Sequence, residues 1–543
     1  MSNSCCSRNN KVVLILFALR LLTSLVHGTP HYSIIKSSCQ TTLYPEICYS
    51  TFSASIAKNL VTKKDVIEHA INKTKYTIQA NIHTINNLTA ATNLTKRSKT
   101  AFHDCLELGT GTLEQLDKVI QDLRAYPNKK TLRKHADDLK TLMSTTITNT
   151  ETCLDGFSHD ATCKRFRKSI NKGQNQGGKM CSNALAMIKN LTDTDIANEA
   201  KYKLKEEKAT VWPKWLSKKE RKLLQSGGVT PNVTVAADGS GKYTTVSAAV
   251  TAAPSRSQNR YVIKIKAGVY RENVQIPSSK TNLMFIGDGR SNTIITASNS
   301  VASGSTTFNS ATVAAVGDGF LARDITFQNT AGPSGNQAVA LRVGSDLSAF
   351  YRCGIIAYQD TLYVHSNRQF YVNCYVAGTV DFTFGNAAVV FQDCQFQARR
   401  PNPKQKNMVT AQGRTDPNQN TGIVIQKCKI SASSDLQPVQ ASFPTYLGRP
   451  WKEYSRTVVM QSSISDVIDP AGWYPWNGDF ALDTLYYREY QNTGAGADIS
   501  NRVNWTGWGV ITITTEATGF TPGSFIAGGS WLSSTDFPFT LGL

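Results

Sequence analysis

Apolar residues along the chain follow two different periods. From Ser33 to about Lys203 they recur at spacings of three and four, and Pro and Gly are rare before Gly173. Two runs carry this spacing: Val66, Ala70 and Ile71, and then Leu113, Leu116, Val119, Ile120 and Leu123. One apolar stripe per helix is typical of helices that bury a single face. This part of the chain is therefore predicted to be a helical bundle.

From about residue 230 the pattern changes to short β-rich segments. Clear examples are Tyr261–Ile265, Leu283–Ile286, Asn292–Thr296 and Ala388–Phe391. Gly, Asn, Asp and Pro separate these segments, as is typical of strands joined by turns. The second part is therefore predicted to be built from strands.

The strand segments also repeat. An aromatic or apolar residue stands three positions before a cysteine in four places: Phe350/Cys353, Tyr371/Cys374, Phe391/Cys394 and Ile425/Cys428. The cysteines are 21, 20 and 34 residues apart, and a period of about 20 to 50 residues indicates stacked coils. We predict an α + β multidomain chain in which a right-handed parallel β-helix follows the helical bundle; an antiparallel β-sandwich is the alternative. Cys353 and Cys374 would lie roughly 5 Å apart in successive coils and are predicted to form a disulfide.

Polar residues form a second repeat, which we call a ladder because its members are expected to stack on successive coils. Gln337, Gln359 and Asp381 are spaced by 22 residues, and Asp360 lies beside Gln359. If each coil has about 22 residues and coils stack roughly 4.8 Å apart, these side chains form one patch. Each aspartate alone reads as a turn residue, but the ladder favours chemistry. Of two close carboxylates one keeps its proton and the other stays ionised, which supplies an acid and a nucleophile.

Other residues fit this interpretation. The amide groups of Gln337 and Gln359 would donate hydrogen bonds to a developing oxyanion. Arg449, within Leu447–Trp451, is a candidate to orient the ionised aspartate, and Trp451 beside it could stack on a sugar face. Only His365 of the 8 histidines lies beyond residue 224. The sequence therefore gives little support to Ser-His-Asp hydrolysis, and it predicts no metal and no cofactor.

The chain start is typical of export. Val12–Leu19 is an apolar run after Arg8 and Lys11, too short to span a bilayer, and small residues for cleavage follow near Gly28. We predict a signal peptide at 1–28 and a secreted protein without a membrane span. Six glycosylation sequons agree with that route: Asn72, Asn87, Asn93, Asn190, Asn232 and Asn504. Cysteines can then pair, with Cys39/Cys48, Cys105/Cys153 and Cys163/Cys181 as candidates.

Charge is unevenly distributed. Residues 1–224 hold 35 Lys and Arg against 19 Asp and Glu, while residues 225–543 hold 24 against 20. A solvated helix surface explains the basic excess, and contact with an acidic wall polymer or a membrane surface is the alternative. Without a nucleic-acid binding motif, a nucleic-acid partner is not expected.

A charged segment joins the two parts. Residues 204–228 form a predicted linker between a front domain at 29–203 and a second domain at 229–543. The segment contains Arg221-Lys222-Leu223-Leu224, which resembles a basic processing site. An exposed segment with few apolar residues is what a protease can bind. We predict cleavage there, with a plain flexible linker as the alternative.

Several motifs of the second domain resemble the signature segments of plant-type pectin methylesterases. They are Gly268–Glu272, Gly335–Leu341, Tyr358–Tyr363, Gly378–Gly385 and Leu447–Trp451. The front domain resembles the pectin methylesterase and invertase inhibitor family, mainly through Cys39, Cys48, Cys105 and Cys153. The whole chain therefore resembles a precursor in which an inhibitor-like pro-region precedes the enzyme.

The resemblance implies residue roles. Asp381 would attack the methyl ester of homogalacturonan pectin, and Asp360 would protonate the departing methanol and later activate water. Gln337 and Gln359 would stabilise the tetrahedral anion, while Arg449 would hold the nucleophile. Trp451 and Tyr363 match sugar-contacting positions. Thr383 departs from the family, which has an aliphatic residue there, and it is expected on the same strand face as Asp381.

The resemblance also implies partners, and two other functions stay open. Pectin would be the substrate, and separate inhibitor proteins and a processing protease would be protein partners. The β-helix could instead belong to a pectate lyase or polygalacturonase-like enzyme, because one fold hosts several pectin chemistries. Alternatively, the chain could act mainly as an inhibitor or binding protein through its front domain.

Overall fold

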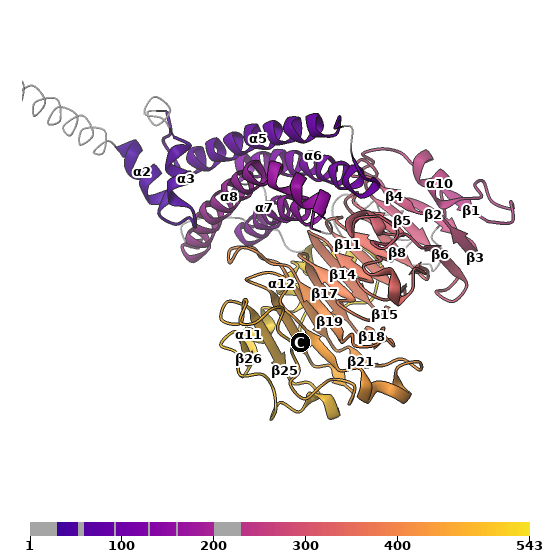
Figure 1. The fold of residues 1–543 in the computed structure, drawn as a ribbon. Coiled ribbons are helices and arrows are strands. Elements are labelled where there is room, and N and C mark those ends of the chain that lie inside the picture. Colours follow the sequence, from indigo (N-terminus) through magenta and orange to yellow (C-terminus); the bar gives the residue numbers. More distant parts are fainter. Residues whose placement is uncertain (1–29, 53–58, 92–93, 129–130, 159–160, 200–229) are drawn as a thin grey trace, which may run out of the picture.

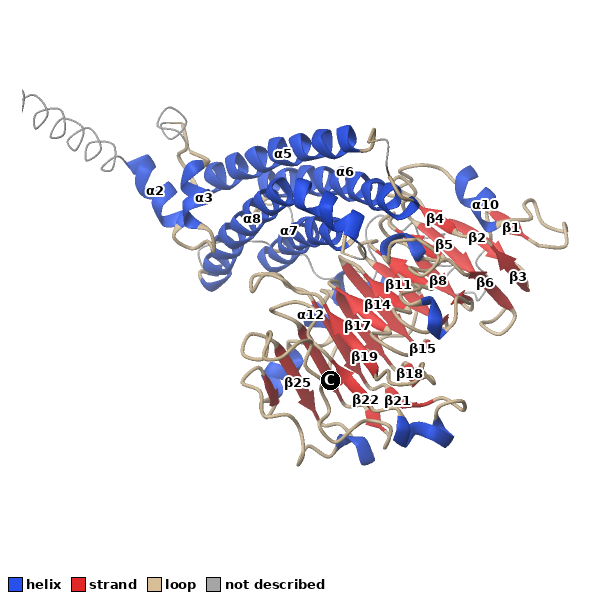
Figure 2. Ribbon diagram, viewed as in Figure 1, coloured by secondary structure: helices blue, strands red, loops and turns tan. Residues whose placement is uncertain are grey.

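The computed structural model describes residues 30–52, 59–91, 94–128, 131–158, 161–199 and 230–543. The predicted signal peptide and the predicted processing site, Arg221 to Leu224, lie outside these residues. No helix in the described ranges is both long and apolar enough to cross a bilayer. Figure 2 shows the helices gathered in one block and the strands stacked in another.

The first block is a bundle of long antiparallel helices. Its helices are α2 (Pro30–Cys39), α3 (Pro45–Ser50), α5 (Lys63–Leu88), α6 (Lys96–Ala125), α7 (Leu132–Asp155) and α8 (Ala161–Ala197). Helices α5 to α8 pack in a ring, each against its neighbours. The hydroxyls of Thr62, Thr95 and Thr131 cap α5, α6 and α7. Each accepts a hydrogen bond from the backbone N–H of the residue three positions later. The predicted apolar stripes are buried, except for half-buried Leu113.

Two of the three candidate disulfides of the bundle are present. Cys39 bonds Cys48, and Cys105 bonds Cys153. The third is wrong, because Cys181 is a free buried cysteine and the Cys163 thiol lies 3.4 Å from the Ser98 hydroxyl.

The second block contains three sheets in which every strand pair is parallel. The largest contains β1 (Val233–Val235), β2 (Tyr261–Ile265), β5 (Leu283–Ile286), β8 (Leu321–Arg323), β11 (Ser348–Tyr351), β14 (Arg368–Val372), β17 (Ala388–Gln392), β20 (Gly422–Gln426), β23 (Arg456–Met460), β25 (Tyr486–Tyr490) and β26 (Trp508–Val510). A seven-stranded sheet contains β4 (Val274–Ile276), β7 (Val313–Ala315), β10 (Leu341–Val343), β13 (Leu362–Val364), β16 (Thr383–Gly385), β19 (Asn407–Gln412) and β22 (Thr445–Gly448). The third sheet contains β3 (Gly268–Arg271), β6 (Thr293–Ala297), β9 (Thr326–Asn329), β12 (Gly354–Ile356), β15 (Tyr375–Gly378), β18 (Gln395–Ala398), β21 (Lys429–Ala432) and β24 (Ser463–Ile464).

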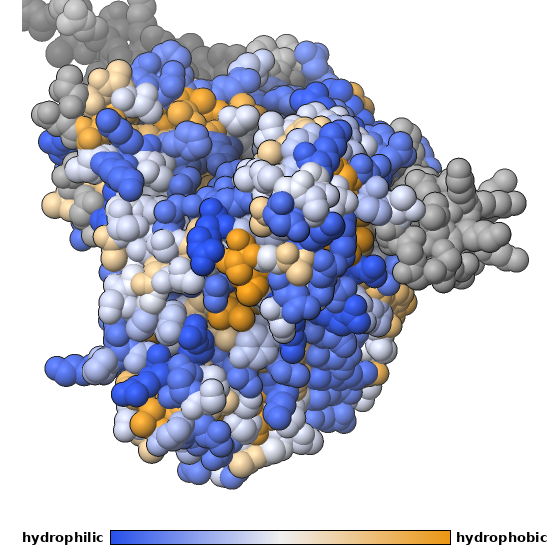
Figure 3. Space-filling view, turned by 90° about the vertical axis from the view of Figure 1, so that its right-hand side faces the viewer, coloured by the Kyte–Doolittle hydropathy of each residue, from blue (hydrophilic) through white to orange (hydrophobic). Residues whose placement is uncertain are grey.

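Successive strands pass through the three sheets in turn, so each coil adds one strand to each sheet. This is a parallel β-helix, as predicted, and the antiparallel sandwich is wrong. Short helices lie outside the coils: α10 (Val246–Ala252), α11 (Thr514–Thr518) and α12 (Pro522–Phe525). In Figure 1 the bundle lies against one flank of the stacked strands. The face drawn in Figure 3 is mostly hydrophilic, with one apolar group near its middle and others toward its upper left and lower left.

The aromatic repeat builds the interior of the β-helix. Phe350, Tyr371 and Phe391 pair in register across β11, β14 and β17. Their rings stack at centroid distances of 4.6 and 4.7 Å, and they are fully buried. Such buried ring pairs contribute about 0.5–1.5 kcal/mol each beyond the area that they bury.

The predicted Cys353–Cys374 disulfide is not formed, because both cysteines are free and buried. The Cys374 thiol instead donates to the backbone carbonyl of Phe350 at 3.4 Å. Equivalent residues of successive coils project their side chains in the same direction. A disulfide requires the two Cβ–Sγ bonds to turn toward each other, with a torsion near 90°.

Thr383 also lies elsewhere than predicted. It pairs in register with Leu362, which pairs with Leu341, and both leucines belong to the apolar core. Thr383 therefore points inward, whereas Asp381 lines a pocket on the outside. The buried Thr383 hydroxyl has no hydrogen-bond partner among the residues that the structure describes.

Replacing Thr383 by valine is expected to stabilise the β-helix by about 1 kcal/mol, because an unpaired buried hydroxyl costs about 1–3 kcal/mol. Denaturant titration of the full chain measures this. Thr361→Val is the matched control, since the equally buried Thr361 hydroxyl donates to Tyr358 and Ala377 carbonyls at 3.0 and 3.2 Å. The control should lose stability; a loss for Thr383→Val would contradict the assignment.

Candidate active site

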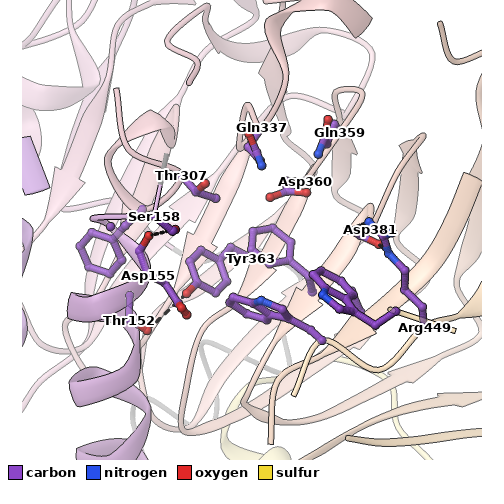
Figure 4. Close-up of a pocket in the computed structure, with 16 residues that line it drawn as sticks. Thr152, Asp155, Ser158, Thr307, Gln337, Gln359, Asp360, Tyr363, Asp381 and Arg449 are labelled. Carbon is purple, nitrogen blue, oxygen red and sulfur yellow. Dashed lines mark hydrogen bonds and ion pairs between the residues drawn. The ribbon is translucent and has the colours of Figure 1, made fainter. Parts of the chain in front are cut away.

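A pocket of about 310 Å³ opens on the outer face of the seven-stranded sheet. Residues from both blocks line it: Thr152, Asp155, Gly156 and Ser158 from the bundle, and Thr307, Phe308, Gln337, Gln359, Asp360, Tyr363, Asp381, Phe384, Ala411, Arg449, Trp451 and Trp476 from the β-helix. All the catalytic and sugar-binding residues predicted from the sequence therefore meet in one place (Figure 4).

The coil register differs from the 22-residue ladder. Leu341, Leu362 and Thr383 pair in register, so one coil here has 21 residues. Asp360 and Asp381, which are 21 residues apart, therefore hold equivalent positions, two residues before their strands. Gln359 precedes Asp360 in the same turn, and Gln337 lies further back in its own turn. The spacing identified residues that do share a pocket, but it placed them in the wrong register.

Both aspartates have a left-handed backbone, with φ of 62° for Asp360 and 51° for Asp381. Asp adopts this conformation more readily than most residues, at a cost of order 1–3 kcal/mol. Both side chains are more than nine-tenths buried. Burial, and then the charge of Asp381, raises the pKa of Asp360 well above its ordinary value, against the opposing effect of Arg449. Asp360 therefore has the character of an acid that keeps its proton.

Arg449 binds Asp381 through two hydrogen bonds. Its Nε donates to Oδ1 at 2.8 Å and its Nη2 donates to Oδ2 at 2.6 Å. This bidentate geometry fixes the plane of the carboxylate and compensates its charge in a buried position. Arg449 follows β22, and its backbone N–H bonds the carbonyl of Thr410 in the neighbouring coil. The predicted partnership of Arg449 with Asp381 is thus present in the structure.

The two glutamines lie next to each other in the pocket, beside Asp360 (Figure 4). Figure 4 shows the side-chain ends of Gln337 and Gln359 directed toward Asp360. Two amide groups directed into the pocket suit the binding of an oxygen that gains negative charge.

Aromatic rings form the floor and one wall. Tyr363 and Phe384, neighbours on β13 and β16, stack at a centroid distance of 4.2 Å. Trp451 meets both edge to face, at 6.5 and 5.9 Å. Gly413 makes room for Trp451, because a Cβ there would lie 2.8 Å from the indole. Stacked rings of this kind suit the apolar face of a sugar.

Sequence reasoning missed two sets of pocket residues. Trp476, with 37% of its surface exposed, stacks on the Arg449 guanidinium at 4.3 Å. It lies in a loop outside the repeat, so no spacing pointed to it. The end of α7 was also missed: the Thr152 hydroxyl lies 3.4 Å from the Tyr363 hydroxyl and 3.0 Å from Nε2 of His365. Burial, and then Arg342, lowers the pKa of His365 to about 3.

The fold and the pocket define a class: a parallel β-helix protein with a buried aspartate pair, two amides and an arginine in an aromatic-walled cleft. Residues 232–529 match the family described as Pectinesterase, and residues 33–187 match Plant invertase/pectin methylesterase inhibitor. The chain belongs to the pectinesterase family and is a carboxylic ester hydrolase with an inhibitor-type helical domain in front.

Three relatives illustrate the likeness. "Pectinesterase/pectinesterase inhibitor U1" of Solanum lycopersicum is 61% identical over 570 residues, covering 99% of this chain and 98% of its own. "Pectinesterase 1" of Citrus sinensis is 64% identical over 521 residues, covering 95% and 89%. The solved pectin methylesterase from carrot is 77% identical, covers 59% of this chain and 100% of its own, and has a TM-score of 0.58. The lyase, polygalacturonase and inhibitor-only alternatives are thereby removed.

Proposed function

We propose that the chain removes methyl groups from homogalacturonan pectin by an aspartate mechanism. Asp381 is the nucleophile, and Asp360 is the acid and base. The observation that carries this assignment is the contrast between the two carboxyls. Asp381 is clamped by Arg449 through two charge-assisted bonds, whereas burial raises the pKa of Asp360.

The reaction follows from this division. A carboxylate oxygen of Asp381 attacks the ester carbonyl carbon, and the carbonyl oxygen becomes an anion that accepts N–H groups from Gln337 and Gln359. Collapse of this intermediate breaks the bond to the methoxy group, which takes the proton of Asp360 and leaves as methanol. Asp360, now ionised, accepts a proton from water as the water attacks the acyl-enzyme. This frees pectate and restores both carboxyls. Trp451 and Tyr363 position the sugar.

The same proposal covers location and processing. The apolar run near the chain start supports secretion to the cell wall, where pectin is the substrate. Cleavage within Arg221–Leu224 would separate residues 29–203 from residues 229–543. The freed cleft would also be open to separate inhibitor proteins of the bundle type, because a bundle of that family occupies it here.

The front domain acts as an autoinhibitor until that cut. Its support is steric and electrostatic. The end of α7 contributes Thr152 and Asp155 to the pocket that holds Asp360. The Lys452 ammonium, beside Trp451, bonds Asp155 at 3.0 Å and Glu151 at 3.5 Å. A cation at a helix C-terminus is also favoured by the helix dipole. A pectin chain cannot enter while α7 remains in this position.

Asp381→Asn and Asp360→Asn are each expected to lower methanol release by at least a thousandfold, about 4 kcal/mol of barrier, because each residue acts in the chemical step. Methanol release by the cut protein measures this. Asp393→Asn is the matched control: Asp393 also has a left-handed backbone, φ 54°, but is exposed on another turn. A nucleophile variant that keeps a tenth of wild-type turnover would sink the assignment.

Changing Arg221 and Lys222 together to alanine is expected to give an uncut chain with little methanol release, because a tethered domain has an effective concentration of order millimolar. Gel analysis shows the cut, and a methanol assay shows the activity. Inserting a specific protease site in 204–228 of this variant provides the control, since cutting there should restore activity. Full activity of the uncut chain would refute autoinhibition and leave the catalytic roles untouched.

Docking of the bundle is expected to weaken as pH rises from about 4 to 7. Asp104 of α6 is buried against the β-helix, and this burial raises its pKa from 3.8 to about 7, although Thr306 and Arg342 oppose the shift and Glu107 adds to it. Docking therefore takes up a proton in this range. The contribution of protonated Asp104 to docking is full below its ordinary pKa of 3.8. It is lost as the pH rises through the pKa of about 7 that Asp104 has in the docked bundle.

The affinity of the bundle for the β-helix is expected to fall by up to about tenfold per pH unit. Dissociation of the cut chain, measured between pH 4 and 8, tests it. Asp104→Asn should flatten the profile, because the amide does not titrate. An equal pH dependence in Asp104→Asn and wild type would assign the effect to other groups.

A further inference from the structure

Helix α8 carries much of the basic excess of the front part. From Ala161 to Thr192 it has seven Lys and Arg residues and no Asp or Glu. Helix α5 packs beside it, as Figure 1 shows, and has no Asp or Glu from His69 to Leu88. These two helices therefore form a flank of the bundle that is basic over a long stretch and has no carboxylates of its own there.

Four of the cations form one row on the exposed side of α8: Arg165, Lys168, Lys172 and Lys179. Their spacings are three, four and seven residues, which places them on a single face of a helix. At a rise of 1.5 Å per residue the row is about 21 Å long. The opposite face of α8, which includes Ile170, is buried in the bundle core. The row therefore points to solvent.

The row has no counter-charges. In the ranges that the structure describes, none of its four members pairs with a carboxylate. Two acids near the end of the neighbouring helix α7, Glu151 and Asp155, pair instead with Lys452 of the β-helix. Uncompensated cations in line concentrate a positive potential along the row.

An ordinary solvated helix surface has a different pattern. It carries charges of both signs, which pair along the face. Helix α6 of the same bundle is an example, with Glu114, Asp117 and Lys118 all exposed on successive turns. The single sign of the row on α8 favours an anionic partner over solvent alone.

The residues between the cations indicate which kind of anion the row can bind. Exposed positions beside the row are polar and uncharged: Ser169, Asn175 and Gln176. The apolar Phe166 and Ile170 are buried. A helix that lies in a membrane surface needs an apolar face to insert, and the bundle already uses the apolar face of α8. Polar side chains between cations suit the hydroxyl groups of a hydrated acidic polysaccharide.

We propose that the row on α8 is a docking surface for de-esterified pectin, in which each galacturonate unit carries a carboxylate. The chemistry of this partner rests on the proposed function. In the described chain the active-site pocket is lined by the end of α7 and by no residue of α8. A polymer held on the row therefore does not compete with α7 for the cleft. The uncut chain would be held on pectin that has already lost methyl groups, before its active site opens.

The test measures binding of the uncut full chain to immobilised polygalacturonate at low salt, by surface plasmon resonance. Changing Arg165→Gln, Lys168→Gln and Lys172→Gln together should weaken binding about tenfold, because three exposed ion pairs are lost and each contributes modestly. Added salt should remove most of this difference, since exposed pairs are screened. Wild type should bind fully methyl-esterified pectin much more weakly, because that polymer is neutral.

The matched control removes the same charge elsewhere in the bundle, by Lys36→Gln, Lys99→Gln and Arg133→Gln at exposed positions of α2, α6 and α7. It should bind polygalacturonate like wild type, and thermal unfolding checks that both triple variants are folded. Equal weakening in the two triple variants would overturn the row and assign the binding to net charge.

Three other outcomes are decisive. Unchanged binding in the row variant, or no binding of wild type to polygalacturonate, would overturn the docking surface. Binding of wild type to vesicles that contain phosphatidylserine, without binding to polygalacturonate, would overturn it in favour of a membrane surface. Methanol release by the cut chain does not use the row and should be equal in wild type and the row variant; its absence from wild type would instead overturn the proposed function.

Discussion

Everything at the active site depends on the in-register stacking of β10, β13 and β16. Parallel pairing at one strand spacing turns residues that are 21 apart in the sequence into neighbours. The same register sends Leu362 into the core and Tyr363 into the cleft, because side chains alternate along a strand. A rigid core ladder of rings below the cleft keeps these positions fixed. The chemistry is therefore held by the sheet and not by long loops.

The register places the carboxyl groups of Asp360 and Asp381 close together. The groups around each carboxyl differ. Asp381 has a bidentate arginine, whereas Asp360 has burial and a neighbouring charge that raise its pKa. Arg449 binds only one of the two carboxyls, although Asp360 and Asp381 hold equivalent positions in successive coils. The roles proposed for the two aspartates rest on this asymmetry.

Sequence patterns predicted the architecture well because it repeats. Short strands, buried stripes and the aromatic ladder each carry a period, and the pocket residues came from a similar ladder. The register of the coils was harder to predict. The 22-residue spacing of the polar residues suggested a coil of 22 residues, whereas the coil has 21. Cys353 and Cys374, which hold equivalent positions, were predicted to form a disulfide, but their side chains are parallel and both are free. Trp476 carries no period at all. A contact between distant loops has no local signal in one sequence.

The total charge of the front part did not predict which of its side chains contact the β-helix. The front part is basic as a whole, yet most of the ion pairs that join it to the β-helix in the described chain use its acids: Glu107 with Arg342, Asp138 with Arg368, and Glu151 and Asp155 with Lys452. Lys118, which pairs with Asp318, has the opposite sense. An acidic polymer and an acidic helix face need the same cations, so a cleft suited to pectate is also suited to this bundle. The proposed inhibition by the front domain would then require no surface that substrate binding does not already provide.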